Sequence, residues 1–201
     1  MIIGLTGGIA TGKSTVSQIL RGQKIPIVDA DIISREVVMP GEEAYGKILS
    51  FFGTKILHED STINRAKLGE IIFNDAEKRE VLNGIVHPAV RKEMKKQAED
   101  FLQAGHPLVV MDIPLLFESK LTHMVDQTWL VYADPDIQLK RLMMRDDFTE
   151  QQAFSRIQSQ MPIDEKKKLA DIIIMNNGSK AELEKEVLQL LKEKIKTDLI
   201  N

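Results

Sequence analysis

The segment Gly7-Gly8-Ile9-Ala10-Thr11-Gly12-Lys13-Ser14 carries the clearest chemical signal in this chain of 201 residues. It fits the pattern G-x-x-x-x-G-K-[ST] of a phosphate-binding loop, or P-loop. The glycines let successive backbone N–H groups point at phosphate oxygens, and the positive end of the following helix attracts the same anion. Lys13 can reach the β- and γ-phosphates, and the Ser14 hydroxyl is suited to magnesium. A glycine-rich turn with a solvated lysine is the alternative, but we predict a nucleotide-binding site.

Three aspartates follow two of the expected strands. Asp29 and Asp31 come directly after the strand expected at residues 26–28, at the edge of a parallel sheet where ligands bind. A carboxylate there can accept the proton of an attacking hydroxyl or hold that hydroxyl in line with the γ-phosphate. Either residue could instead cap the following helix. Asp112 ends the strand expected at residues 108–111, where it can orient magnesium through water or cap a turn.

Arg141 and Arg145 lie four residues apart on an expected helix and therefore share one face of it. Paired helices that carry arginines are typical of the lid of small kinases. The planar guanidinium matches phosphate oxygens and stays charged, and a closing lid excludes water. The alternative is a solvated basic face that pairs with Asp146 and Glu150.

Short apolar runs alternate with longer amphipathic ones, which is the pattern of a parallel sheet covered by helices. Five buried strands are expected, at residues 2–5, 26–28, 108–111, 128–132 and 172–175. Helix starts are marked by Asp134-Pro135 and by capping boxes at Thr149 with Gln152 and Ser179 with Glu182. The last helix carries an apolar stripe, formed by Leu183, Val187, Leu190, Leu191 and Ile195.

Residues 35–87 separate the second strand from the third and are too many for a simple crossover. We expect helices at residues 42–52, 66–73 and 76–86, and a further helix that begins at His87-Pro88. The chain is therefore predicted to be one domain over residues 1–201. Its core spans about 1–34 and 88–201, with a helical acceptor-binding insertion at about 35–87 and a lid at about 141–162.

Composition excludes several classes of protein. Basic residues number 27 and acidic residues 30, so the net charge of −3 offers no basic excess for a nucleic acid. The chain has no cysteine, which rules out disulfides and thiolate metal sites. Neither a signal peptide nor an apolar run of the roughly 20 residues that span a bilayer is visible, so we expect a cytoplasmic protein. The four histidines lack metal-ligand spacing, Trp129 is expected in the core, and the charge run at residues 165–168 is expected to be solvated.

A P-loop occurs in switch GTPases, motor ATPases and small-molecule kinases. The chain contains neither the Asn-Lys-x-Asp of guanine recognition nor an Asp-x-x-Gly switch. The third strand ends in the single carboxylate of Asp112, where an ATP-driven machine would normally show an acidic pair. These observations favour a kinase. A kinase for another small acceptor, such as a nucleoside or a sugar acid, and a nucleotide-binding regulatory module remain as alternatives.

With these pieces assembled, the chain resembles the dephospho-CoA kinase family, and the resemblance extends over its whole length. The motifs that carry it are Leu5-Thr6-Gly7-Gly8 leading to Gly12-Lys13-Ser14-Thr15, Asp29-Ala30-Asp31 with Arg35, His87-Pro88, Asp112-Ile113-Pro114-Leu115-Leu116-Phe117-Glu118, Arg141 with Arg145-Asp146, Ala170-Asp171, and Asn176-Asn177-Gly178. One departure is Met175, where the family pattern has an aspartate. The P-loop is common to many families, whereas the combination of Asp-Ala-Asp, His-Pro and Pro-Leu-Leu-Phe-Glu is far more specific.

The resemblance implies a three-layer α/β P-loop fold with a five-stranded parallel sheet, a helical substrate-binding insertion and a helical lid. It implies ATP-dependent phosphorylation of the ribose 3′-hydroxyl of dephospho-CoA, the last step of coenzyme A synthesis. The partners would be ATP and dephospho-CoA, with Mg²⁺ as cofactor, no nucleic acid and no membrane, in a monomer or weak homo-oligomer.

The resemblance also assigns roles to residues of this chain. The expected catalytic residues are Asp31 as the base, Lys13, Arg141 and Arg145. ATP would contact Gly8, Ala10, Thr11, Gly12, Lys13, Ser14, Thr15 and, near the adenine, Asn176. The acceptor would contact Thr6, Asp29, Asp31, Arg65, His87 and Leu115, and the metal would contact Ser14 and Asp112.

Overall fold

A five-stranded parallel sheet in the order β2-β3-β1-β4-β5 forms the centre of the protein. The computed structural model describes residues 1–198, with side chains to residue 195. The strands are β1 (Ile2–Gly7), β2 (Ile27–Asp29), β3 (Val109–Asp112), β4 (Gln127–Tyr132) and β5 (Ile172–Met175). The α/β fold class and the five predicted strands are thereby confirmed.

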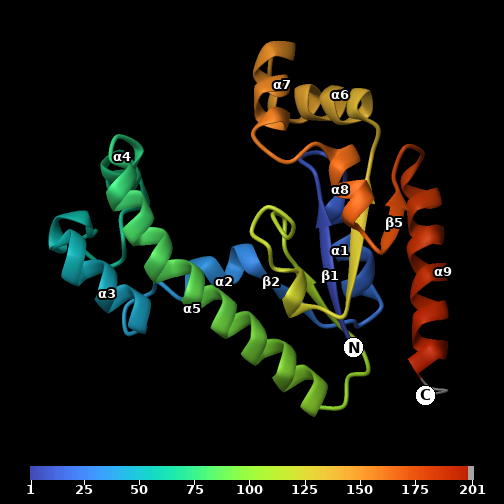
Figure 1. Ribbon diagram of the computed structural model, residues 1–201, viewed down its shortest axis with the longest axis horizontal. Coiled ribbons are helices and arrows are strands. Elements are labelled where there is room, and N and C mark those ends of the chain that lie inside the picture. Colours follow the sequence, from blue (N-terminus) through green and yellow to red (C-terminus); the bar gives the residue numbers. More distant parts are fainter. Residues whose placement is uncertain (199–201) are drawn as a thin grey trace. The chain divides into compact units, whose positions relative to one another are not determined.

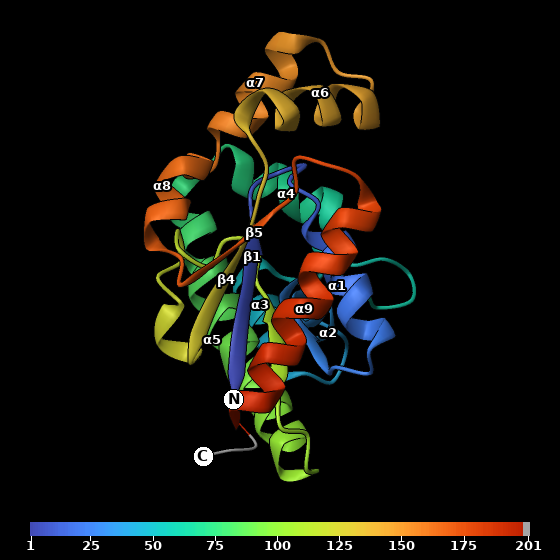
Figure 2. The ribbon, with the colours of Figure 1, turned by 90° about the vertical axis from the view of Figure 1, so that its right-hand side faces the viewer.

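Helices cover the sheet because its strands are apolar on both faces. On one face, α1 (Lys13–Gly22) and α9 (Lys180–Asp198) contact each other and lie against the strands (Figure 2). The core there includes Leu5, Val110 and Trp129, and Trp129 is fully buried as predicted. The α9 stripe also faces this core, through Leu183, Val187 and Leu191 with Leu190 and Ile195 beside them.

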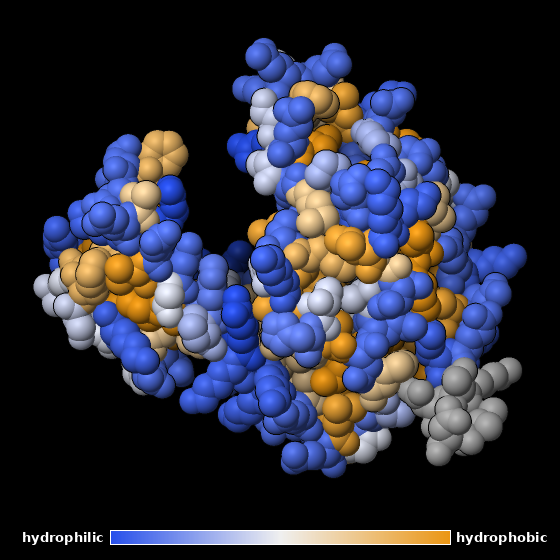
Figure 3. Space-filling model, viewed as in Figure 1, coloured by the Kyte–Doolittle hydropathy of each residue, from blue (hydrophilic) through white to orange (hydrophobic). Residues whose placement is uncertain are grey.

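The chain divides into two compact units. The core unit comprises residues 1–28 and 98 onward, and the helical unit comprises residues 29–97. The helical unit contains α2 (Ala30–Glu36), α3 (Glu43–Phe52), the 3-10 turn η1 (Thr54–Ile56), α4 (Arg65–Phe73) and most of α5 (Ala76–Gln103). It has its own small core of Ile48, Phe52, Ile56 and Leu68, and hydrophobic atoms are visible among hydrophilic ones on its surface (Figure 3).

Helix α5 corrects one prediction. We expected a new helix to begin at His87-Pro88, but α5 runs without interruption from Ala76 to Gln103 with Pro88 inside it. Proline removes one helical hydrogen bond, which weakens a helix without necessarily ending it. Apolar side chains before the proline, such as Leu82 and Val86, pack on the core of the helical unit, and Met94 beyond it is buried. Burial on both sides outweighs the local cost.

The predicted lid lies in the core unit as α6 (Pro135–Asp146) and α7 (Glu150–Gln158), which contact each other beyond one end of the strands (Figure 1). The 3-10 turn η2 (Thr122–Met124) precedes β4, and α8 (Ile163–Leu169) precedes β5. Helix α6 starts after Asp134 as predicted. The Thr149–Gln152 capping box and the reciprocal bonds between Ser179 and Glu182 are also confirmed. Within residues 1–198, no helix combines the length and the apolarity needed to cross a bilayer.

Candidate active site

The P-loop connects β1, which ends at Gly7, to α1, which begins at Lys13. Ala10 and Gly12 adopt left-handed backbone conformations, with φ of 60° and 92°. Such a turn directs N–H groups toward a common point. In the described part of the chain, the N–H groups of Ala10, Gly12, Lys13 and Ser14 find no acceptor. The loop therefore presents a cradle of donors for an anion.

Asn176, which follows β5, holds the P-loop from the side. Its amide Nδ2 donates to the backbone oxygen of Thr11 at 2.7 Å, and the side chain is 7% exposed. A Cβ atom built on Gly12 would collide with this amide. Glycine is thus required at residue 12 both by its backbone conformation and by the close approach of Asn176. The structure gives Asn176 a role in shaping the loop that its predicted place near the adenine did not include.

Asp112 lies at the end of β3, opposite Leu5 of β1 in the register of the sheet. Its carboxylate is buried and accepts from Lys13 Nζ through Oδ1 and from Ser17 Oγ through Oδ2. A buried carboxylate needs such partners because burial without them is costly. The sheet therefore brings together Lys13 and Asp112, two of the predicted site residues that are 99 positions apart in the sequence.

Two glutamines that the sequence analysis missed hold the P-loop from the lid side. Gln138 of α6 is buried, and its Nε2 donates to the Ile9 oxygen at 2.8 Å. Gln160, which follows α7, accepts from the Ile9 N–H through Oε1 at 3.0 Å. Both polar groups of one P-loop residue are thus bound by side chains around the lid. No motif marks these glutamines, because glutamine is common on solvated helices.

The two predicted lid arginines differ in their surroundings. Arg141 is partly buried, and its Nη1 is buried without a hydrogen-bond partner among the described residues. Arg145 is more than half exposed and binds Asp146 through two hydrogen bonds of 2.9 Å. These bonds raise the pKa of the Arg145 guanidinium and lower that of the Asp146 carboxyl. For Arg145, the pairing with Asp146 that we considered as the alternative is the observed arrangement.

Two residues or segments of the core unit are more buried than the sequence indicated. Thr6 is fully buried, and its hydroxyl donates to the Pro114 oxygen at 3.0 Å, so this side chain holds the loop after β3, and its contact with the substrate stays a prediction. The charge run at residues 165–168 is solvated only in part, because Lys166 is fully buried. Leu115, by contrast, is 42% exposed on the loop that follows β3.

In the helical unit, the two candidate bases are distinguished by their hydrogen bonds. Asp29 caps α2, since its Oδ1 accepts from the N–H groups of Asp31 and Ile32 at 3.0 and 3.1 Å. Asp31 is exposed in the first turn of α2, and none of the described residues bonds to its carboxylate. Helix capping therefore applies to Asp29, and Asp31 retains a carboxylate that can accept a proton.

The helical unit also contains an apolar pocket of about 220 Å³. Arg65, the first residue of α4, is its charged member. Ser34 adds a hydroxyl group, and Gly69 adds a residue without a side chain. The rest of the lining is aliphatic and consists of Val38, Ile48, Ile63, Leu68, Ile72, Leu82 and Val86. His87 is exposed on α5 and is not part of this lining.

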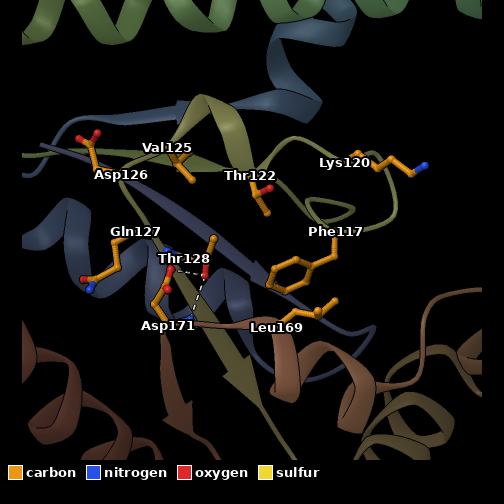
Figure 4. A pocket seen from close by; sticks show the side chains of 9 residues that line it. All are labelled: Phe117, Lys120, Thr122, Val125, Asp126, Gln127, Thr128, Leu169 and Asp171. Carbon is orange, nitrogen blue, oxygen red and sulfur yellow. Dashed lines mark hydrogen bonds between the residues drawn. The ribbon is translucent and has the colours of Figure 1, made fainter.

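A cavity of about 430 Å³ in the core unit lies where β4 and β5 begin, at the sheet edge opposite the P-loop (Figure 4). Its two carboxylates already serve the fold. Asp171 accepts from the N–H and the hydroxyl of Thr128, both at 2.7 Å, which lowers the pKa of Asp171 (Figure 4). Asp126 accepts from the Ile2 N–H at 2.7 Å. We therefore do not assign this cavity to the reaction.

The parallel sheet, the cradle between β1 and α1, and the arginine-bearing helices α6 and α7 define a P-loop kinase. The model of the dephospho-CoA kinase family matches residues 1–182. A dephospho-CoA kinase of Bacillus cereus is 55% identical over 192 residues, 96% of each chain. One of Geobacillus kaustophilus is 52% identical over 193 residues, again 96% of each.

The solved structure of dephospho-CoA kinase from Campylobacter jejuni superposes with a TM-score of 0.78 at 31% identity, over 98% of both chains. The chain belongs to the dephospho-CoA kinase family. Its activity is the ATP-dependent phosphorylation of dephospho-CoA, the final step of coenzyme A biosynthesis.

Proposed function

We propose that this chain transfers the γ-phosphoryl group of ATP to the ribose 3′-hydroxyl of dephospho-CoA, with Asp31 as the base and Lys13, Arg141 and Arg145 as the cationic groups around the phosphoryl group. The observation that carries the proposal is the P-loop of this chain, which belongs to the dephospho-CoA kinase family. Several N–H groups of this loop have no acceptor among the described residues, and they lie beside Lys13. Phosphoryl transfer requires mainly positioning and charge stabilisation, and these groups supply both.

Lys13 is placed to act on the phosphates without leaving Asp112. An ammonium group has three donors, and Asp112 takes one of them. The remaining donors can bind β- and γ-phosphate oxygens. Arg141 has a buried guanidinium nitrogen with no partner in residues 1–198, so it can donate to an incoming anion at no cost in existing bonds. Arg145 must share its donors with Asp146 or exchange them.

The oxygen donors at this site fit Mg²⁺. Ser14 presents an exposed hydroxyl on the first turn of α1, and the buried Asp112 carboxylate, which accepts from Lys13 and Ser17, lies at the adjacent strand end, where it can orient magnesium through water. Magnesium in kinases is typically held by one or two such groups together with water and substrate phosphates. When bound, Mg²⁺ would neutralise charge on the phosphates. Ser14 and Asp112 are the residues that would hold it.

Asp31 is the better base because its carboxylate is not engaged. The Asp29 carboxylate already accepts two N–H groups of α2. Asp31 is exposed and can accept the proton of the ribose hydroxyl as the oxygen attacks the phosphorus atom. We assign Asp29 to fixing the first turn of α2, on which Asp31 is carried.

The apolar pocket of the helical unit suits the acceptor's pantetheine arm. Dephospho-CoA combines this neutral chain with an anionic diphosphate. The pocket offers aliphatic side chains, such as Ile48 and Ile72, beside the cationic Arg65. Apolar lining with one charged group is the usual composition of a small-molecule site. This proposal places Arg65 on the acceptor, whereas the exposed His87 has no comparable support.

The first experiment measures ADP release with ATP and magnesium, using dephospho-CoA, AMP, adenosine or no acceptor. We expect turnover with dephospho-CoA alone, with coenzyme A as the product. ADP release without an acceptor would indicate an ATPase, and turnover with another acceptor would overturn the substrate assignment. Tight nucleotide binding with slow turnover throughout would favour a regulatory module.

The base is tested by comparing Asp31→Asn with Asp29→Asn. Loss of a general base typically reduces turnover by about 10²–10⁴-fold, which we expect for Asp31→Asn with the KM for ATP nearly unchanged. Asparagine caps helices as well as aspartate does, so Asp29→Asn should retain most of the turnover. Equal losses in the two variants would contradict the assignment of Asp31.

A cytoplasmic location and a monomeric or weakly associating state belong to the same proposal. Both substrates are small molecules, and none of the proposed roles requires a second subunit. Sedimentation equilibrium of the full chain, with and without ATP, measures the association directly. A stable oligomer would contradict the proposed state.

A further inference from the structure

Lys166 of α8 is a buried charge that the proposed reaction does not use. Its side chain is completely inaccessible to solvent, although its neighbours Lys167 and Lys168 are exposed. The Nζ atom lies 2.8 Å from Glu118 Oε1 and 3.1 Å from the Gly7 oxygen. A buried ammonium is retained only when it is paired and hydrogen-bonded, so this arrangement is specific.

The partners of Lys166 border the nucleotide site. Gly7 is the first residue of the P-loop, and Lys166 binds its carbonyl oxygen. Glu118 belongs to the loop after β3, the strand that ends at Asp112. Lys166 Nζ also approaches the Pro114 oxygen of that loop, at 3.4 Å. One side chain from α8 thus ties the start of the P-loop to the loop that follows Asp112.

The same pair also reaches the lid. Glu118 Oε1 accepts the N–H of Met161, in the segment between α7 and α8, at 3.1 Å. The preceding residue, Gln160, binds the N–H of Ile9 in the P-loop. Beyond the pair, Phe117 and Leu169 line the cavity where β4 and β5 begin (Figure 4). The ion pair therefore joins the loop after β3 to α8.

We propose that Lys166 and Glu118 are positioning residues that fix the first peptide of the P-loop relative to the segment returning from the lid. They thereby set the affinity for ATP without touching it, because Lys166 is fully buried. The inference rests on the proposed use of the P-loop to bind ATP. It differs from a purely structural role, in which the pair would stabilise the fold and leave the loop geometry unaffected.

The test uses Glu118→Gln, Lys166→Met and the double variant Lys166→Met/Glu118→Gln, with Lys168→Met as control. Lys168 is exposed on the same helix and pairs with Glu165 at the surface. Glu118→Gln leaves a fully buried ammonium and Lys166→Met leaves a partly buried carboxylate, each without its counter-charge, so both should lower the free energy of unfolding. The double variant removes both charges and should regain much of that stability.

The two roles differ in their effect on ATP. We expect the double variant to regain stability and yet bind ATP more weakly, because no group then holds the Gly7 oxygen. The KM for ATP and the calorimetric Kd should rise by roughly tenfold, the order expected from a small displacement of groups around a ligand. The KM for dephospho-CoA should stay near the wild-type value, and Lys168→Met should match the wild type throughout.

Wild-type affinity for ATP in a stable double variant would overturn the inference, as would equal changes in the KM of both substrates. If the methionine variants fail to fold, Glu118→Gln tests the other half of the pair: it removes the counter-charge of Lys166 while retaining the shape of the side chain and should also raise the KM for ATP, whereas an unchanged KM would overturn the inference. The calorimetric Kd does not depend on turnover. A wild-type chain that binds ATP but does not phosphorylate dephospho-CoA would refute the acceptor assignment and leave this test intact.

Discussion

The contact between Gly12 and Asn176 predicts that substitutions at these two residues are strongly coupled. Gly12 has a left-handed backbone conformation, with φ of 92°, which costs an alanine about 1–2 kcal/mol. A Cβ atom there would also displace the amide of Asn176 from the Thr11 oxygen. A buried acceptor left without its hydrogen bond costs about 1–3 kcal/mol. Gly12→Ala should therefore lower the free energy of unfolding by about 2–5 kcal/mol.

Asn176→Ala alone should lower the same free energy by about 1–3 kcal/mol, because it removes only the bond to Thr11. In the double variant that bond is lost once and the collision is absent. The double variant should therefore be more stable than the sum of the two single effects predicts, by about 1–3 kcal/mol.

The assay is urea unfolding of the four proteins, with free energies from linear extrapolation and a check that the slopes agree. Gly105→Ala serves as the control, since Gly105 has nearly the same φ of 90° and nothing within 4 Å of a built Cβ. It measures the backbone cost alone. Additive effects of Gly12→Ala and Asn176→Ala, within about 0.5 kcal/mol, would refute the argument that both act through the Thr11 bond.

Two further predictions concern pH. Burial is the larger cause, and the hydrogen bond to Asp164 the next, that raises the pKa of Tyr132 from 10.0 to about 12. The neutral phenol therefore stabilises the fold below pH 10, and this contribution is lost as the pH rises through about 12. Tyr45→Phe leaves Tyr132 as the single tyrosine, and its ultraviolet titration should show a midpoint near 12; a midpoint near 10.0 in the folded protein would contradict this. The bonds from Thr128 lower the pKa of Asp171 below its ordinary value of 3.8. Asp171→Asn should therefore destabilise the protein at neutral pH. The difference in stability between this variant and the wild type should vanish as the pH falls through the lowered pKa of the folded protein. A difference in urea midpoint that does not change with pH would refute the second prediction.

The local features of the fold were predictable because their signals are short-range. The P-loop motif, the capping box at Thr149 and the start of α6 after Asp134 depend on residues within a few positions of each other. Five apolar runs separated by helical segments predicted the sheet, and each run forms a strand. The continuation of α5 through Pro88 was not predictable in this way, because the packing that sustains it involves residues outside the helix.

The sequence also showed which residue types the site contains, but it did not show the role of each residue. Asp29 and Asp31 carry the same side chain two positions apart, and only the hydrogen bonds of α2 show that Asp29 is the cap. Gln138 and Gln160 look like ordinary residues of solvated helices, yet both bind Ile9. Thr6 belongs to the motif but faces Pro114.

The sequence by itself determined the class of chemistry, since a glycine-rich turn before a lysine and a serine can bind phosphate wherever a strand and a helix flank it. Tertiary structure decided which charges are buried and what they hold. Lys166 sits in a run of three lysines that are identical in type, and only the packing of α8 buries the first of them against Gly7 and Glu118. Burial and long-range pairing arise when segments that are distant in the sequence pack against each other. Residue types and their spacing within one segment do not specify which distant segment packs against it.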